Sequence, residues 1–114
     1  MARSATIIEL DPAVIRFAKR LSEDIGATAV LLIGSRARGT NDPDSDYDIV
    51  IVSEHFAGID RFERQRGLKL LFYEVGGFAP MDLYCITPEE FEFGRNHITM
   101  LADVLPEAID LLAA

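Results

Sequence analysis

A short apolar run in the first third of the chain constrains the fold most. Residues 28–33 combine alanine, leucine and β-branched residues, which predicts a strand buried on both faces. Upstream, Asp11 and Pro12 predict the start of a helix, as its N-cap and its first residue, and Gly26 predicts its end. The sequence therefore predicts a helix followed at once by a buried strand, as in a chain whose helices and strands alternate.

The remaining elements continue this alternation. We expect a polar loop with room for one helical turn at 34–45, a strand at 46–52, a helix at 59–75, a strand at 81–86, a short helix that begins at Thr87, and a last helix at 96–104. In the helix at 59–75, the core face is expected to carry Phe62, Leu70 and Tyr73. After Pro106, residues 108–112 fit either a helix or a short edge strand.

Composition bounds the class of protein. The chain has 114 residues, 49% of them hydrophobic and 26% charged, which predicts one globular domain over residues 1–114. The net charge of -8 repels a polyanion, so general nucleic-acid binding is not expected. The longest apolar run, 29–33, is too short to cross a membrane, and no signal peptide is recognised. With a single cysteine, these features lead us to expect a cytoplasmic protein.

A Gly-Ser turn follows the buried strand. Gly34 lacks a Cβ, so backbone there can approach a ligand closely. The backbone N–H groups that open the next turn suit an anion, as does the Ser35 hydroxyl. Arg36 and Arg38 place two cations within a few residues of the turn. The pattern predicts a cradle for a triphosphate.

Three aspartates form a second pattern. Asp46 and Asp48 are two apart, which in a strand puts both carboxylates on one face and Tyr47 on the other. Adjacent carboxylates repel and need a shared proton or a divalent cation, and oxygen ligands favour Mg²⁺, with Mn²⁺ as a substitute. Asp82 can join them, as third ligand or as base, if the strand at 81–86 lies beside the strand at 46–52.

These residues resemble the minimal nucleotidyltransferases of the DNA polymerase β superfamily. Their signature is a Gly-Ser pair, about ten residues, an Asp-x-Asp pair and a third acid on a later strand, and the chain matches it over about 11–104. The matching residues of the combined motif are Gly34, Ser35, Ala37, Gly39, Ser45, Asp46 and Asp48, with Asp82 downstream. The resemblance implies an α/β fold (α+β) in which helices pack on a small mixed sheet.

The resemblance also implies a reaction. It suggests Mg²⁺-dependent transfer of an NMP group, with ATP as the favoured donor, to a hydroxyl acceptor. Gly34 and Ser35 would hold the triphosphate, and Asp46 and Asp48 would bind the metal. Asp82 would complete the metal site and activate the acceptor. Further candidates for nucleotide contact are Arg36, Arg38 and Ser45.

The resemblance suggests a partner as well. The sequence ends soon after the catalytic motif and shows no second domain for an acceptor, and minimal proteins of this kind often pair with a helical protein of the HEPN type. The chain would then act as an antitoxin that nucleotidylates its partner, or as one part of a two-component transferase. The alternative is a non-catalytic antitoxin that neutralises the partner by contact. Transfer to a small molecule is disfavoured, and a homo-oligomer remains open.

Other patterns have simpler interpretations. The alternating aspartates at 42–48 do not form an EF-hand loop, because counting from Asp44 puts Ile49 at the glycine position and His55 at the glutamate position. No second ligand is spaced to form a zinc site with either histidine. Cys85 is expected to be buried rather than catalytic. Two sets stay open between a structural and a binding role: the basic residues Arg61, Arg64, Arg66 and Lys69, and the apolar residues Ile98, Leu101, Ala102 and Leu105.

Overall fold

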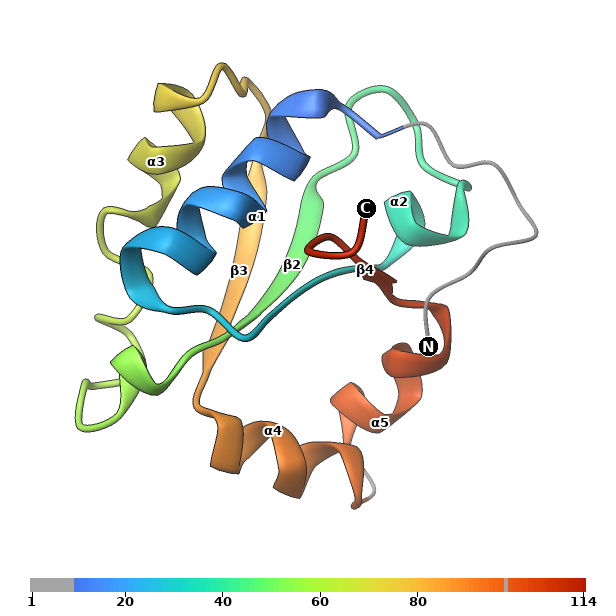
Figure 1. Ribbon diagram of the computed structural model, residues 1–114. Coiled ribbons are helices and arrows are strands. Elements are labelled where there is room, and N and C mark those ends of the chain that lie inside the picture. The colour runs from blue at the N-terminus through green and yellow to red at the C-terminus, as the bar shows by residue number, and fades with distance from the viewer. Residues whose placement is uncertain (1–9, 98) are drawn as a thin grey trace.

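A four-stranded mixed sheet organises the molecule (Figure 1). The computed structural model describes residues 10–97 and 99–114. The strands stand in the order β3-β2-β1-β4, with β1 antiparallel to both of its neighbours and β3 parallel to β2. Their bounds are Ala29–Ile33 for β1, Tyr47–Val52 for β2, Met81–Ile86 for β3 and Ile109–Asp110 for β4. The expected small mixed sheet with packed helices is confirmed.

Helices lie against both sides of this sheet. They are α1 (Pro12–Ile25), α2 (Ser35–Arg38), α3 (Leu68–Glu74), α4 (Pro88–Arg95) and α5 (Met100–Val104), with 3-10 turns at Glu54–Phe56 and Leu105–Glu107. Figure 1 shows α1 beside α3, and α4 with α5 at the other end of the molecule. No helix in the described ranges is long and apolar enough to span a membrane.

The first helix begins and ends as the sequence predicts. The Asp11 carboxylate accepts a hydrogen bond from the Ala13 N–H (2.9 Å), and Pro12 is the first helical residue. Gly26 ends the helix in the left-handed conformation at φ 63°. The buried side of α1 is lined by Ala13, Val14, Phe17, Ala18 and Leu21.

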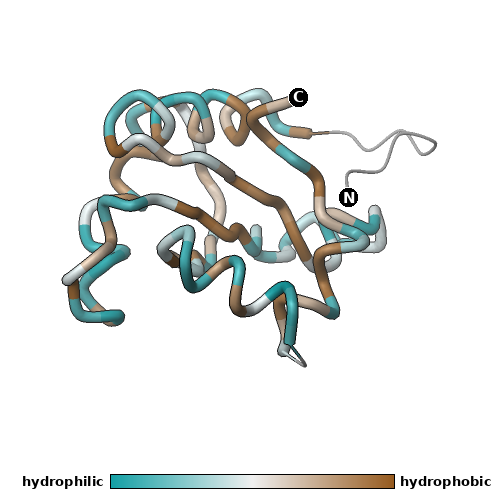
Figure 2. The backbone as a smooth tube through the Cα atoms, turned by 60° about the horizontal axis from the view of Figure 1, so that its bottom comes forward, coloured by the Kyte–Doolittle hydropathy of each residue, from teal (hydrophilic) through white to brown (hydrophobic). Residues whose placement is uncertain are grey.

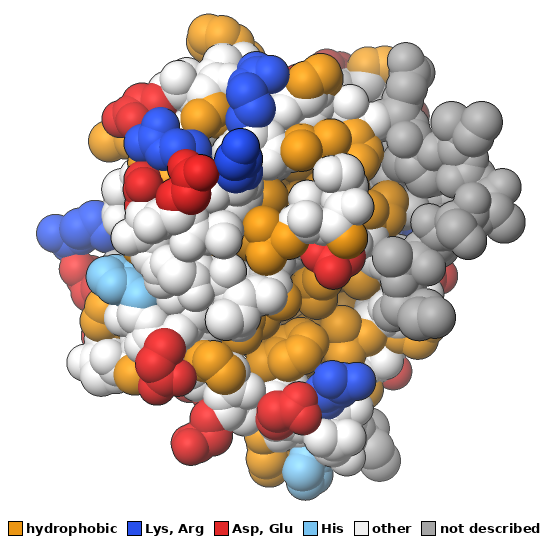
Figure 3. All heavy atoms as spheres, in the orientation of Figure 1, with side chains coloured by type: hydrophobic (Ala, Val, Ile, Leu, Met, Phe, Trp, Pro, Cys, Tyr) orange, Lys and Arg blue, Asp and Glu red, His pale blue; other side chains and the backbone are white. Residues whose placement is uncertain are grey.

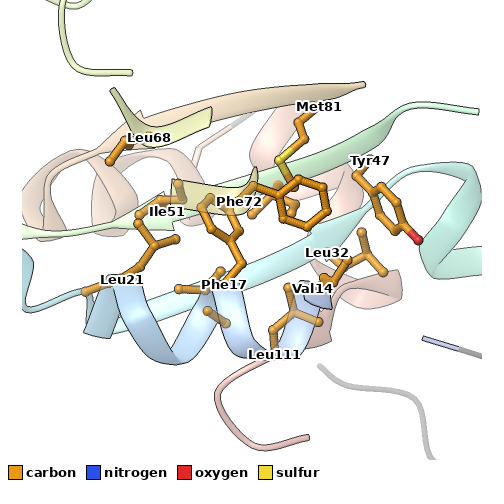
Figure 4. Packing of buried hydrophobic residues seen from close by; sticks show 14 of the residues in the cluster. Val14, Phe17, Leu21, Leu32, Tyr47, Ile51, Leu68, Phe72, Met81 and Leu111 are labelled. Carbon is orange, nitrogen blue, oxygen red and sulfur yellow. The ribbon is translucent and has the colours of Figure 1, made fainter. Parts of the chain in front are cut away.

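Each face of the sheet has its own apolar core. The larger one joins α1 and α3 to alternate strand residues, with the Phe17 and Phe72 rings 5.5 Å apart edge to face (Figure 4). The smaller one lies on the other face and consists of Leu31, Ile33, Val50, Val52, Leu101 and Ala108. Figure 2 shows the strands as hydrophobic segments through the middle of the molecule, and Figure 3 shows apolar side chains across the middle of one side.

The predicted helix at 59–75 is wrong over its first half. Residues 61–67 form turns, and α3 begins only at Leu68, because Gly67 adopts φ 81° and Asp60 accepts a hydrogen bond from the Phe62 N–H. The predicted core face is wrong too. Phe62, Leu70 and Tyr73 are exposed, and the buried residues of α3 are Leu68 and Phe72.

The predicted helix at 96–104 is also shorter than expected. It begins at Met100, since the Thr99 hydroxyl accepts a hydrogen bond from the Ala102 N–H (3.2 Å). Leu101 is buried in the smaller core, whereas Ile98, for which a core or interface role was left open, lies outside the described residues. The edge-strand alternative for 108–112 is confirmed, because β4 pairs with β1.

Candidate active site

The strand register brings three motif residues into one row. Asp48 on β2 lies opposite Ile33 on β1 and opposite Asp82 on β3. Gly34 follows Ile33 directly, so the order across the sheet is Gly34, Asp48, Asp82. Because Val50 and Val52 belong to the smaller core, Asp48 points to that same face. The condition that the sequence left open for Asp82, a strand beside β2, is met.

Gly34 touches the carboxylate of Asp48 with its backbone. Its torsion angles are φ 77° and ψ −157°, a region that side-chain-bearing residues hardly occupy. A Cβ placed on Gly34 would lie 2.6 Å from Oδ2 of Asp48, well inside contact distance. The Gly34 carbonyl accepts hydrogen bonds from the N–H groups of Ala37 and Arg38, each at 3.1 Å, and so starts α2. Only glycine lets this helical turn begin so close to an acid.

The three carboxylates influence one another. Asp48 is half-buried, and its pKa is raised first by that burial, then by the negative charges of Asp82 and Asp46 and by a hydrogen bond with Asp82. Asp46 and Asp82 are exposed and line a pocket of about 310 Å³, to which Lys69 also contributes. The charges therefore gather at one end of an otherwise apolar sheet face, where bringing a carboxylate out of water is unfavourable.

The acids do not form a ready-made coordination sphere. Within the described parts of the chain, no three His, Cys, Asp or Glu side chains are grouped closely enough to hold a metal ion. The strand predicted from residue 46 begins at Tyr47, so Asp46 precedes the strand. The same-face rule for residues two apart applies within a strand and therefore does not fix where Asp46 points.

Both motif arginines make contacts within the protein. The Nε of Arg36 donates to the Ser45 carbonyl (3.0 Å), and its guanidinium lies 4.0 Å from the centre of the Tyr47 ring. Arg38 forms a 3.3 Å ion pair with Glu107. The Ser45 hydroxyl accepts from the Asp42 N–H (3.0 Å) and closes the turn before β2. Arg36 thus holds the loop that delivers the acids, and contact of these residues with a nucleotide stays a prediction.

Tyr84 is the neighbour of the acids that the sequence interpretation missed. It lies two residues after Asp82 on β3 and so on the same face. The pKa of its hydroxyl is raised by burial and by the negative charges of Asp48 and Asp82. The alternation of positions 82, 84 and 86 was the available signal. Cys85, on the opposite face, is buried as expected.

Comparison with known proteins gives one family and one fold. The family model described as a nucleotidyltransferase domain matches residues 14–106. A candidate nucleotidyltransferase from Sulfolobus solfataricus is similar in structure, with a TM-score of 0.50 at 18% identity over 92% of this chain and 90% of that one. No curated protein matches the chain.

Two plant structures share the fold as well. BolA1 from Arabidopsis thaliana has a TM-score of 0.54 at 22% identity, over 71% of this chain and 98% of that chain. The BolA domain of SufE1 from Arabidopsis thaliana has a TM-score of 0.54 at 20% identity, over 72% and 99%. At such identities the likeness concerns the fold alone, and the row of Gly34, Asp48 and Asp82 has to be interpreted from its own geometry.

Proposed function

Because the chain belongs to the nucleotidyltransferase domain family, we propose that it moves the NMP group of a nucleoside triphosphate, ATP before others, onto a hydroxyl acceptor. One observation supports this above all: the register sets Asp48 beside Asp82 and opposite the last residue of β1, after which Gly34 follows directly. A phosphate site and an acid site would then lie side by side, as phosphoryl transfer requires. We place the reaction in the cytoplasm, which contains both ATP and Mg²⁺.

We propose that the acids bind a divalent cation. The pKa of Asp48 is raised by burial and by two neighbouring negative charges, and a bound cation would reverse this penalty. The donors are all oxygens, which suits Mg²⁺ or Mn²⁺. We assign Asp48 and Asp82 as ligands, with Asp46 joining them when the nucleotide is present. When bound, Mg²⁺ would neutralise charge on the reacting phosphates.

The chain's own residues then have separate tasks. Gly34, which has no Cβ, lets the turn begin beside Asp48. The Ser35 hydroxyl and the first N–H groups of that turn would donate to the triphosphate. The acceptor oxygen attacks the α-phosphorus, the bond from this phosphorus to the bridging oxygen breaks, and pyrophosphate leaves. The acceptor proton passes to the carboxylate of Asp82, on the far side of Asp48 from Gly34.

We propose a protein acceptor. In keeping with the resemblance to paired minimal nucleotidyltransferases, the hydroxyl would belong to a tyrosine on a helical partner of the HEPN type, and the chain would serve as the antitoxin. Tyr84, Phe93 and Met100 are large apolar side chains left exposed near the acid face, which a partner could cover.

The second candidate is an antitoxin that acts by contact alone. It is favoured by two observations: the acids of the described chain are not grouped to hold a metal ion, and Arg36 and Arg38 already have partners within the protein. In that case the nucleotide site would be vestigial and binding of the partner would not depend on ATP.

Titration with ATP, with and without Mg²⁺, separates the two candidates. We expect Mg²⁺-dependent binding that Asp48→Asn loses and Asp44→Asn keeps, because Asp44 carries the same charge in the exposed loop before β2 and lies outside the row. Label from α-³²P-ATP should then appear on the partner. If wild-type protein binds no nucleotide, even with the partner present, the transferase proposal fails and the contact candidate replaces it.

A further inference from the structure

An apolar cleft lies on the sheet face of Asp48, and its lining begins two residues further along β2 and β3, at Val50 and Tyr84. It has a volume of about 540 Å³, within the range of small-molecule sites. Its floor is the sheet, and its far wall is α4 and α5. The apolar lining consists of Val50, Tyr84, Ile86, Phe93, Met100 and Leu101.

The far wall is held in place. A Cβ on Gly94 would lie 2.8 Å from a methyl carbon of Leu101, so α4 and α5 are in close contact there. At the start of α4, Glu90 completes a capping box with Thr87. Glu90 also forms a 2.6 Å ion pair with Arg64, whose side chain is only 9% exposed. The cleft is therefore formed before any ligand arrives.

Solvent reaches the cleft even though its lining is apolar. Phe93 is 60% exposed and Met100 51% exposed, although both border it. Covering these two side chains with an apolar group would be favourable, since each Å² of apolar surface removed from water lowers the free energy by about 25 cal/mol. The cleft is therefore suited to an apolar group.

The order of Gly34, Asp48 and Asp82 across the sheet indicates which apolar group the cleft binds. In an in-line displacement, the attacking oxygen lies opposite the leaving pyrophosphate. If pyrophosphate leaves on the Gly34 side of Asp48, the acceptor approaches from the side of Asp82 and β3. Tyr84, two residues further along β3, begins the cleft, at a strand distance of about 7 Å from Asp82. The nucleoside of the triphosphate does not need to occupy the cleft in this arrangement.

We infer that the cleft binds the body of the acceptor, so the acceptor hydroxyl is carried by a ring-sized apolar group and not by a sugar or a phosphate ester. Arg61 and Glu90 both line the cleft and pair with each other at 3.8 Å, so their charges offset one another there. The net charge of -8 on the chain disfavours an anionic acceptor. The inference rests on the proposed function and specifies its substrate class. The bonds made and broken are those given above, with the proton passing to Asp82.

Binding of simple probes tests the assignment. Benzyl alcohol and N-acetyltyrosinamide both join a ring to a hydroxyl, whereas glycerol has the hydroxyls without the ring. We expect saturable NMR shifts at Gly94 and Leu101 with both ring compounds and none with glycerol. Met100→Gln and Phe93→Ser should each weaken binding at least threefold. Leu70→Gln is the matched control, since Leu70 is 65% exposed on α3 and lines no part of the cleft.

Binding of magnesium-ATP to the wild-type protein and to each variant distinguishes the possible outcomes. The cleft variants Met100→Gln and Phe93→Ser should still bind magnesium-ATP. With wild-type protein, α-³²P label should pass from ATP to a ring compound and not to glycerol. More label on the tyrosine amide would indicate a protein side chain, and more on benzyl alcohol a free small molecule. Ring compounds that bind equally to all variants, or cleft variants that lose ATP, would overturn the assignment. Failure of the proposed function shows separately, as wild-type protein that binds no ATP.

Discussion

Replacing Gly34 with alanine tests the close contact at the centre of the site. The backbone at φ 77° and ψ −157° costs a residue with a Cβ roughly 1–3 kcal/mol. The new Cβ would also lie 2.6 Å from Oδ2 of Asp48. The negative charges of Asp82 and Asp46 oppose a movement of that carboxylate toward either of them. We therefore expect the free energy of unfolding to fall by about 2–4 kcal/mol, the sum of backbone strain and a modest overpacking penalty.

Gly26→Ala supplies the matched control. Gly26 also has positive φ, at 63°, but a Cβ there would meet no atom within 4 Å. The left-handed conformation costs alanine about 1–2 kcal/mol, and the stiffer unfolded chain offsets part of this. Urea unfolding followed by circular dichroism should therefore give a loss of about 1 kcal/mol, with an unchanged m-value.

A double-mutant cycle isolates the contact itself. In an Asp48→Ala background the nearest atom would be the Cβ of residue 48, at 3.6 Å from the Gly34 Cβ, which is ordinary contact. Gly34→Ala should then lose only its backbone strain, and the two substitutions should couple by about 1 kcal/mol or more. If Gly34→Ala costs the same in both backgrounds, and no more than Gly26→Ala, the proposed close approach is refuted.

Three further predictions concern charge and burial. Because the folded state raises the pKa of Asp48, the contribution of Asp48 to stability should fall as pH rises through the acid range, and Asp48→Asn should remove that contribution and raise the metal-free melting temperature at pH 7. Arg64→Ala should cost about 2 kcal/mol in urea unfolding, since the nearly buried guanidinium bonds both Glu90 and the Cys85 carbonyl. Burial raises the pKa of Cys85 to about 11, so iodoacetamide at pH 8 should label it only after unfolding, and rapid labelling of folded protein would contradict its burial.

The sequence predicted those elements whose signals are local. The β-branched run at 28–33 and the apolar strand at 81–86 need no distant partner to be recognised, and both strands are present. The same holds for the start of α1 at Asp11 and for the start of α4 at Thr87, where capping side chains bond within three residues. The local pattern was also enough to predict that Asp48 and Asp82 would lie in strands, whereas Asp46 lies just before β2.

What failed depended on contacts between distant segments. A helix over 59–75 was expected from apolar spacing, but Arg64 donates to the Ile59 carbonyl and reaches the Cys85 carbonyl 21 residues away, which holds this segment in turns. Tyr84 could not be placed near the acids before the register of β3 against β2 was known. Contact of Arg36 with phosphate stays a prediction, but sequence proximity alone does not reveal that its Nε bonds the Ser45 carbonyl.

Helices cover only part of one face of the sheet, which explains why this face can carry charged acids. Along β2, Asp48 is half-buried, whereas Val50 and Val52, on the same face, are almost fully buried. The helix α5 covers the two valines through Leu101, which packs with them in the smaller core. Full cover would bury Asp48 beside two like charges, which is costly without a cation. The position of α4 and α5 therefore sets both features at once, an open acid row for a charged substrate and a neighbouring apolar cleft for an uncharged one.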